Sequence, residues 1–232
     1  MSTHLSTDQL LHAYTVMRTI RDFEERLHVE FATGEIPGFV HLYAGEEASA
    51  AGVMAHLRDD DCIASNHRGH GHCIAKGVDV FGMMAEIYGK KTGVCGGKGG
   101  SMHIADFSVG MLGANGVVTA GLPIACGAAH ALKLQGKPHL VACFFGDGAI
   151  NRGPFLEALN WAAVYQLPVL FICEDNRYSA TSSTTGLTAG PGVCARANAL
   201  GVPSESVNGN DVQAVHTAAG DLVAKVRAGD GP

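Results

Sequence analysis

The chain has 232 residues, of which 47% are hydrophobic and 16% charged, so it can bury a full core and is too apolar to be disordered. Its net charge of −6, without a basic run, argues against nucleic acid as the main partner. The seven cysteines are scattered and form no CxxC pair, which favours reduced core residues in a cytoplasmic protein. No apolar run is long enough to span a membrane and the amino terminus carries no export signal, so no membrane partner is expected.

A long amphipathic helix is predicted at the amino end. The segment 6–9 has the capping-box pattern, and apolar residues recur at helical spacing from 10 to 31. Gly34 is expected to end this helix. Because it precedes any strand, we expect the helix to cover the sheet or to dock on a partner. It would be an extension, residues 6–33, of a single domain that occupies residues 1–232.

A loop at 35–45, rich in proline and glycine, carries His41 and leads into a predicted helix of small residues. That helix begins with Glu46 and Glu47, whose charges suit the positive end of a helix dipole. A short strand is then expected at 62–65.

Three interpretations are open for the segment 66–72, which contains three histidines and an arginine. One is a zinc site, since imidazole is a common ligand, although the H-x-x-H-x-H spacing fits no helix register. Another is a set of solvated or structural loop histidines. We favour the third, anion binding, in which His67 and Arg68 clasp a diphosphate, because guanidinium offers a planar fork of donors.

Glycines are dense between 89 and 116, after a predicted helix at 79–88. A loop this long inside a compact domain is usually functional or mobile. It contains GGKGGS, but it lacks the GxxxxGK[ST] spacing and follows no apolar strand, so we do not read it as a phosphate-binding loop. Residues 121–135 then predict a buried helix of small residues.

The central feature of the sequence is a strand–helix–strand unit. Residues 139–145 and 168–173 are continuous apolar runs, typical of strands buried on both faces, and the segment 154–166 between them has helical spacing. Such a unit is a right-handed crossover, which makes its two strands parallel. The fold class expected is therefore α/β, with a doubly wound parallel sheet and helices on both faces.

Asp147 and Asn176 come directly after those two strands. The carboxyl ends of adjacent parallel strands lie at one edge, where open sheets bind ligands. Carboxylate and amide oxygens there could share a hard cation such as magnesium. The alternative is that both are ordinary turns, which favour glycine, aspartate and asparagine in any case.

The remaining residues begin with a polar, glycine-rich stretch at 179–193, expected to lie over the ligand edge. Asn210 is predicted to cap a final helix that continues to about Val226. A crossover helix normally leads to another strand and none follows it here, so the carboxyl-terminal part of the domain is expected to be missing.

Several stretches resemble the α subunits of 2-oxo acid and acetoin dehydrogenase complexes. GFVHLYAGEEA, HRGHG, GGKGGSMH and GDGAINRGPFLEALNWAAVYQLPVLFICEDNRYSATS are similar to motifs of that family and occur in the same order. The resemblance covers nearly the whole chain. It implies a thiamine diphosphate-binding fold, with thiamine diphosphate and magnesium as cofactors.

The resemblance also implies site residues. It assigns magnesium to Asp147, Asn176 and the Tyr178 carbonyl. Its cofactor-binding set is His67, Arg68, Gly116, Val118, Asp147, Gly148, Ala149, Asn176 and Tyr178. His41 would be catalytic, at the mouth of the site, where it assists acyl transfer to a lipoyl group; the alternative is an exposed loop histidine. The chain departs from the family at two places. Asp175 stands where the family usually has asparagine, and the segment Thr119-Ala-Gly also differs from the usual family sequence.

In that family a glutamate that activates the cofactor comes from a β subunit, so the resemblance implies an α2β2 heterotetramer and a lipoyl-bearing acyltransferase component. The wording of EIPGFVHLYAGEEAS and SNHRGHGHCIAKG is closer to acetoin enzymes than to pyruvate enzymes. The expected reaction is cleavage of acetoin with transfer of the acetyl group to a lipoyl carrier. The alternatives are oxidative decarboxylation of pyruvate or another 2-oxo acid, and a truncated, non-catalytic remnant.

Overall fold

The computed structural model describes residues 5–232. Residues 1–4 lie outside the described residues. The predictions that include them are the domain at 1–232 and the absence of an export signal at the amino terminus. Within residues 5–232, no helix combines the length and the apolar character that crossing a membrane requires.

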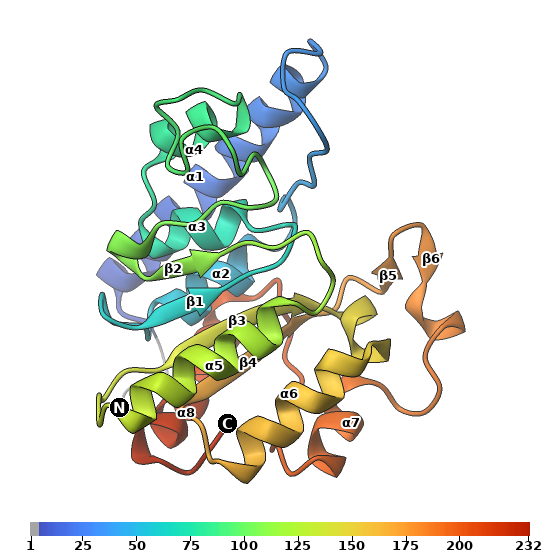
Figure 1. Cartoon of the computed structure of the whole chain (residues 1–232). Coiled ribbons are helices and arrows are strands. Elements are labelled where there is room, and N and C mark those ends of the chain that lie inside the picture. Colours follow the sequence, from blue (N-terminus) through green and yellow to red (C-terminus); the bar gives the residue numbers. More distant parts are fainter. Residues whose placement is uncertain (1–4) are drawn as a thin grey trace.

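A parallel sheet forms the centre of the fold, in the order β2-β1-β3-β4 (Figure 1). Its strands are β1 (Cys62–Ala64), β2 (Met111–Gly113), β3 (Val141–Gly146) and β4 (Val169–Glu174). The chain starts at β1, moves outward to β2, and then returns to the other side of β1 to add β3 and β4. This reversal is the topology of a doubly wound sheet and confirms the predicted fold class.

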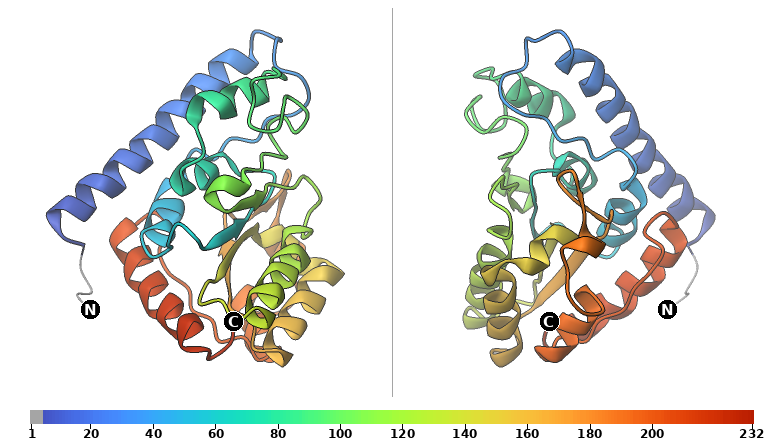
Figure 2. Two further views of the ribbon diagram at one scale, coloured as in Figure 1. Left: turned by 60° about the vertical axis from the view of Figure 1, so that its left-hand side comes forward. Right: turned by 90° about the vertical axis from the view of Figure 1, so that its right-hand side faces the viewer.

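Helices cover both faces of the sheet, and Figure 2 shows α1 and α8 on the opposite side from α5 and α6. One face carries α1 (Thr7–Phe31), α2 (Glu47–Met54), α3 (His70–Lys76), α4 (Val80–Ile87) and α8 (Val212–Ala228). The other carries α5 (Gly121–Leu134), α6 (Gly153–Val164) and α7 (Val193–Ala199). Alternate residues of β3 enter the two cores, Ala142 and Phe144 on one side and Val141 and Cys143 on the other. The continuous apolar run is thereby explained.

Capping explains where the two longest helices begin. Ser6 accepts from the Gln9 backbone while the Gln9 side chain accepts from the Ser6 backbone, which confirms the capping box. For α8 the prediction of an Asn210 cap was wrong. The carboxylate of Asp211 instead accepts from the backbone amides of Gln213 and Ala214.

Among the strands and α-helices of residues 5–232, four short elements were not predicted. Strand β2 lies inside the glycine-rich segment, α7 follows the polar stretch at 179–193, and that stretch itself begins with a short hairpin of β5 (Tyr178–Ser179) and β6 (Ser182–Ser183). Each is seven residues or shorter. Elements of this length have too little periodicity to stand out from a loop, and pairing or packing elsewhere decides them.

Candidate functional site

The loops that follow the four parallel strands meet at one edge of the sheet. Residues 65–68 follow β1, 114–118 follow β2, 147–149 follow β3 and 175–178 follow β4. The strand order reverses between β1 and β3, and ligands of doubly wound sheets bind outside the carboxyl ends at such a switch point. The fold therefore brings nearly all of the predicted site residues to a single edge.

His41 joins this edge from the loop between α1 and α2. Its ring meets that of His67 edge to face, with centroids 4.8 Å apart, and the Arg68 guanidinium donates to the Leu42 carbonyl. Burial, reinforced by His41 and Arg68, lowers the pKa of His67 to about 4, so this imidazole is neutral at pH 7. Burial and the Arg68 charge also lower the pKa of His41. The His41–His67–Arg68 group thus offers an anion one full charge and a neutral donor.

The other two histidines of the segment 66–72 have a different role. His70 and His72 lie on α3 and are fully buried, so of the second interpretation the structural role fits them and the solvated-loop role does not. The His70 ring nitrogens lie 2.9 Å from Glu24 Oε1 and 2.9 Å from Ser101 Oγ. Such saturated histidines tie helices and loops together rather than bind metal.

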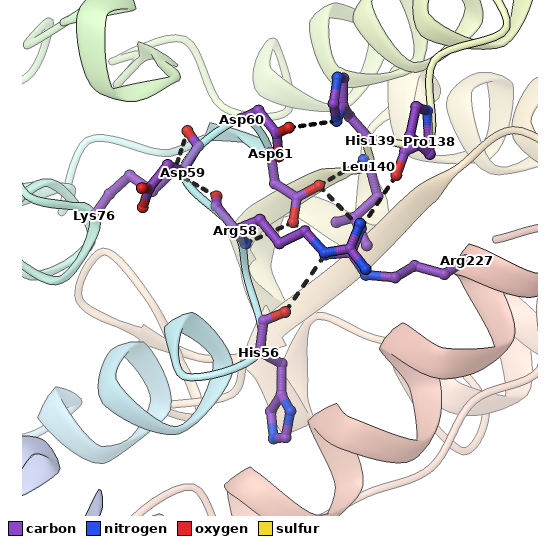
Figure 3. Close-up of polar contacts among 10 residues, drawn as sticks. All are labelled: His56, Arg58, Asp59, Asp60, Asp61, Lys76, Pro138, His139, Leu140 and Arg227. Carbon is purple, nitrogen blue, oxygen red and sulfur yellow. Dashed lines mark hydrogen bonds and ion pairs between the residues drawn. The ribbon is translucent and has the colours of Figure 1, made fainter.

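The zinc interpretation gains no support. Among residues 5–232, the cluster with metal-ligand spacing is Asp60, Asp61 and His139, which lies before β1 and β3, at the opposite edge of the sheet. Asp61 there already forms an ion pair with Arg227, and it accepts from the backbone amides of Arg58 at 2.7 Å and Leu140 at 2.9 Å (Figure 3). The cluster therefore braces β1, β3 and α8.

Asp147 begins a 3-10 turn directly after β3 and is buried. Its Oδ2 accepts from Thr184 Oγ1 at 2.7 Å, whereas its Oδ1 has no hydrogen-bond partner within the described chain. Burial, together with the nearby Asp175, raises the pKa of the Asp147 carboxyl above its ordinary value. A buried carboxylate oxygen without a partner is costly and rare, and a bound cation would satisfy it.

Gly148 is required by close packing. A Cβ added to it would lie 2.7 Å from Ser179 Oγ and 2.9 Å from Ser179 Cβ, so Ser179 or the turn would have to shift. The β5 hairpin is thereby held directly against the turn that carries Asp147. Ala149, the next residue, is buried and packs in the core on the α5–α6 side.

Asn176 lies on the same edge, because Gly146 pairs with Glu174 in the β3–β4 register. Its side-chain amide donates to Glu46 Oε1 at 3.2 Å, and its Oδ1 accepts from the Tyr178 backbone at 3.0 Å. These contacts fix which end of the amide faces which neighbour. The Tyr178 side chain is exposed.

The loop after β2 carries Gly116 and Val118. The Gly116 backbone amide donates to His103 Nε2 at 3.3 Å, and the Val118 side chain is exposed. His103 was not singled out from the sequence. His103 is the last residue of GGKGGSMH and accepts a hydrogen bond from this loop. No local sequence pattern predicts that contact.

A buried polar cluster behind the edge was also missed. Glu174 Oε1 accepts from the Tyr43 hydroxyl, from Ser49 Oγ at 3.0 Å and from His72 Nε2 at 3.0 Å, whereas its Oε2 has no partner within residues 5–232. Burial acts to raise the Glu174 pKa, but His72 and the two hydroxyl donors outweigh burial and lower it. Burial and the Glu174 charge raise the pKa of the neighbouring Glu46 to about 7.

Comparisons with known proteins show the family of this chain. The model of the family described as "Dehydrogenase E1 component" matches residues 15–232. The subunit alpha of acetoin:2,6-dichlorophenolindophenol oxidoreductase is 58% identical in Cupriavidus necator and 53% identical in Bacillus subtilis. Each match covers 98% of this chain and 68% of the relative. The pyruvate dehydrogenase E1 component subunit alpha of Rhizobium meliloti is 38% identical, with 98% of this chain and 65% of the relative covered.

Among solved structures, transketolase from Campylobacter jejuni matches with a TM-score of 0.59 over 77% of this chain and 31% of that one, at 20% identity. This likeness concerns the fold alone and agrees with the doubly wound sheet. The family match over most of the chain and the identities above are decisive together: the chain belongs to the dehydrogenase E1 component family.

Proposed function

We propose that this chain is the α subunit of a thiamine diphosphate-dependent acetoin dehydrogenase, which cleaves acetoin and passes the acetyl group to a lipoyl carrier. Family membership implies the cofactor, and the names of the two relatives above 50% identity support the substrate. The observation that carries the proposal is the buried, unpartnered Oδ1 of Asp147 at the switch point of the sheet.

Magnesium and the diphosphate fit the residues present. Asp147, Asn176 and the Tyr178 carbonyl would hold magnesium, which prefers oxygen ligands and shares its shell with phosphate oxygens. The Arg68 guanidinium and the neutral His67 would hold the diphosphate beside it, with backbone donors from Gly148 and Ala149. The backbones of Gly116 and Val118 would position the aminopyrimidine ring.

The cofactor, when bound, supplies the carbanion chemistry, and the protein supplies binding, orientation and exclusion of water. His41 would act at the mouth of this site during acyl transfer. Its lowered pKa keeps the ring neutral at pH 7, so it can accept a proton at one nitrogen and donate at the other.

The rest of the assembly follows from the family. A β subunit would complete an α2β2 heterotetramer and contribute the activating glutamate, and a lipoyl-bearing acyltransferase component would take the acetyl group. The names of the relatives as alpha subunits support a β partner. We place the assembly in the cytoplasm, in keeping with scattered cysteines without a CxxC pair.

Steady-state assays of the chain coexpressed with its β subunit test the proposal. We expect turnover of acetoin to exceed that of pyruvate at equal concentration, and to require both thiamine diphosphate and magnesium. Faster turnover of pyruvate would favour the alternative suggested by the weaker pyruvate dehydrogenase match. A complex that binds no cofactor in the presence of magnesium would instead indicate a non-catalytic remnant.

A further inference from the structure

Two side chains fix the backbone of the turn after β2, one on each side of Gly116. His103 Nε2 accepts from the Gly116 backbone amide at 3.3 Å, and Asn115 Oδ1 accepts from the Val117 backbone amide at 2.8 Å. Since the described chain has no cis peptide bond, the carbonyl of each of these peptides points away from its own N–H group. The two contacts therefore set the directions of both peptide planes that meet at Gly116.

The His103 ring also packs directly against this peptide. A Cβ added to Gly116 would lie 3.3 Å from His103 Cε1, 3.4 Å from His103 Nε2 and 3.6 Å from Met102 Sδ. Because Nε2 accepts a hydrogen bond, it carries no proton, and the neutral ring has its proton on Nδ1. Unlike the fully buried His70, His103 is exposed to solvent, so replacing it leaves the core of the chain intact.

The glycine-rich loop holds His103 in place from behind. Gly99 packs so closely that a Cβ added to it would lie 2.4 Å from the His103 carbonyl oxygen. The Gly99 backbone amide donates to Glu86 Oε1 at 2.6 Å, and Ser101 Oγ lies 2.9 Å from His70 Nε2. Both Glu86 and His70 are fully buried. A buried carboxylate of α4 and a buried imidazole of α3 thus fix the segment that presents His103 to Gly116.

Glycine has the widest backbone freedom of all residues, so a glycine that must present its peptide in one orientation needs a restraint from outside. We infer that His103 is a positioning residue for the aminopyrimidine ring of the cofactor, which it serves by holding the Gly116 peptide in one orientation. The inference rests on the proposed function, in which the backbones of Gly116 and Val118 position that ring. An aminopyrimidine carries hydrogen-bond donors and acceptors side by side, so a rotated peptide would set like groups against each other.

Calorimetry with two ligands tests the inference on the complex of this chain with its β subunit, in saturating magnesium. The ligands are thiamine diphosphate and inorganic pyrophosphate, of which only the first has a ring. His103→Leu removes the acceptor at similar size, so it should weaken thiamine diphosphate binding about tenfold and pyrophosphate binding by less than about twofold. His103→Gln should restore most of the lost affinity, because its amide oxygen can replace Nε2 as the acceptor.

Hydrogen exchange without any ligand provides an independent measurement. The Gly116 amide should exchange faster in His103→Leu than in the wild type, whereas the amides of β3 should not, because a single local hydrogen bond is lost. His28, exposed in the last turn of α1, offers the matched control. His28→Leu should change neither the exchange of the Gly116 amide nor the affinity for either ligand.

The outcomes separate this inference from the proposed function. Equal weakening of both ligands by His103→Leu would indicate a general structural role, and unchanged affinity for thiamine diphosphate would show that the ring does not depend on this peptide. Either result, or a His103→Gln variant as weak as His103→Leu, would overturn the inference and leave the proposed function standing. A wild-type complex that binds no thiamine diphosphate in magnesium would instead overturn the proposed function, and the inference with it.

Discussion

Two buried carboxylate regions of this chain differ in how completely they are satisfied. Glu86, beneath the glycine-rich loop, is fully buried, and each of its oxygens accepts two backbone N–H groups: Cys95 and Gly97 on Oε2, Gly99 and Gly100 on Oε1. Asp147 and Glu174, at the carboxyl edge, each keep one oxygen without a partner in the described chain. The backbone of the glycine-rich loop satisfies both oxygens of Glu86, whereas one oxygen each of Asp147 and Glu174 has no partner in the described chain.

The pKa directions of Glu86 and Asp147 express the same contrast, whereas His72 and two hydroxyl donors lower the pKa of Glu174. For Glu86, burial acts to raise the pKa, but the four backbone donors outweigh it and the pKa lies below its ordinary value. For Asp147, burial and Asp175 together raise the pKa above its ordinary value. The glycine-rich loop is thus built around a stabilised anion, whereas the Asp147 carboxyl at the edge keeps an oxygen without a partner in the described chain.

Replacing the Glu86 carboxylate, which is fully hydrogen-bonded, should have the largest effect on stability. Glu86→Gln leaves a single acceptor oxygen for four backbone donors, and stranding two of them should cost about 3 kcal/mol of unfolding free energy. Urea denaturation measures this loss. The exposed Glu157→Gln is the control and should change stability by less than about 0.5 kcal/mol. Equal losses for the two variants would contradict the role given to Glu86.

Asp147→Asn should have the opposite effect on the isolated chain. It removes a buried charge without a compensating cation, so the unfolding free energy without magnesium should stay level or rise by about 1 kcal/mol. Cofactor binding by the complex with its β subunit should weaken about 100-fold, as measured by calorimetry in magnesium. The exposed Asp221→Asn is the control for both measurements. Clear destabilisation of the isolated chain would mean that the edge is satisfied internally after all.

The pH dependence of stability tests the environment of His67, one of the residues proposed to bind the diphosphate. The folded pKa of His67, about 4, lies below the ordinary histidine pKa of 6.5, so the unfolded state binds more protons between these values. Stability should therefore fall as the pH drops from about 6.5 to 4. After discounting for partial exposure, the share from His67 should be about 1–2 kcal/mol.

His67→Gln should remove that share, measured as a smaller drop in melting temperature on acidification. The exposed His12→Gln shows the effect of the substitution itself. An unchanged acid sensitivity in His67→Gln would show that other groups cause it.

The smallest expected effect is the change in cofactor affinity caused by Gly148→Ala, which adds a single methyl group. Gly148→Ala pushes a Cβ into Ser179, so cofactor affinity should fall about threefold to tenfold, and Ser179→Gly in the same chain should restore part of it. Gly186→Ala is the matched control, because nothing lies within 4 Å of its added Cβ. A double variant as weak as Gly148→Ala alone would argue against this contact.

Local pattern was enough to predict much of the fold. The two apolar runs at 139–145 and 168–173 became β3 and β4, and the segment at 154–166 became α6, within one or two residues of the expected bounds. Since the two strands of such a crossover are parallel, the position of Asp147 and Asn176 at one edge of the sheet could also be predicted.

Other features depended on contacts that are distant in the chain. Strand β2 has three residues and becomes recognisable only through its pairing with β1. Tyr43, His72 and Glu174 lie in three separate segments of the chain. No local sequence pattern predicts that Tyr43 and His72 hydrogen-bond to Glu174. The burial of His70 likewise depends on Glu24, 46 residues away.

The sequence alone therefore determined the family, the class of fold and the position of Asp147 and Asn176 after the two central strands, because periodicity and short motifs are encoded between neighbouring residues. Only the tertiary structure decided which buried carboxylates are satisfied. That outcome depends on which donors folding brings within hydrogen-bonding distance from elsewhere in the chain. It gave Glu86 four donors, and it left Asp147 Oδ1 and Glu174 Oε2 without one in the described chain.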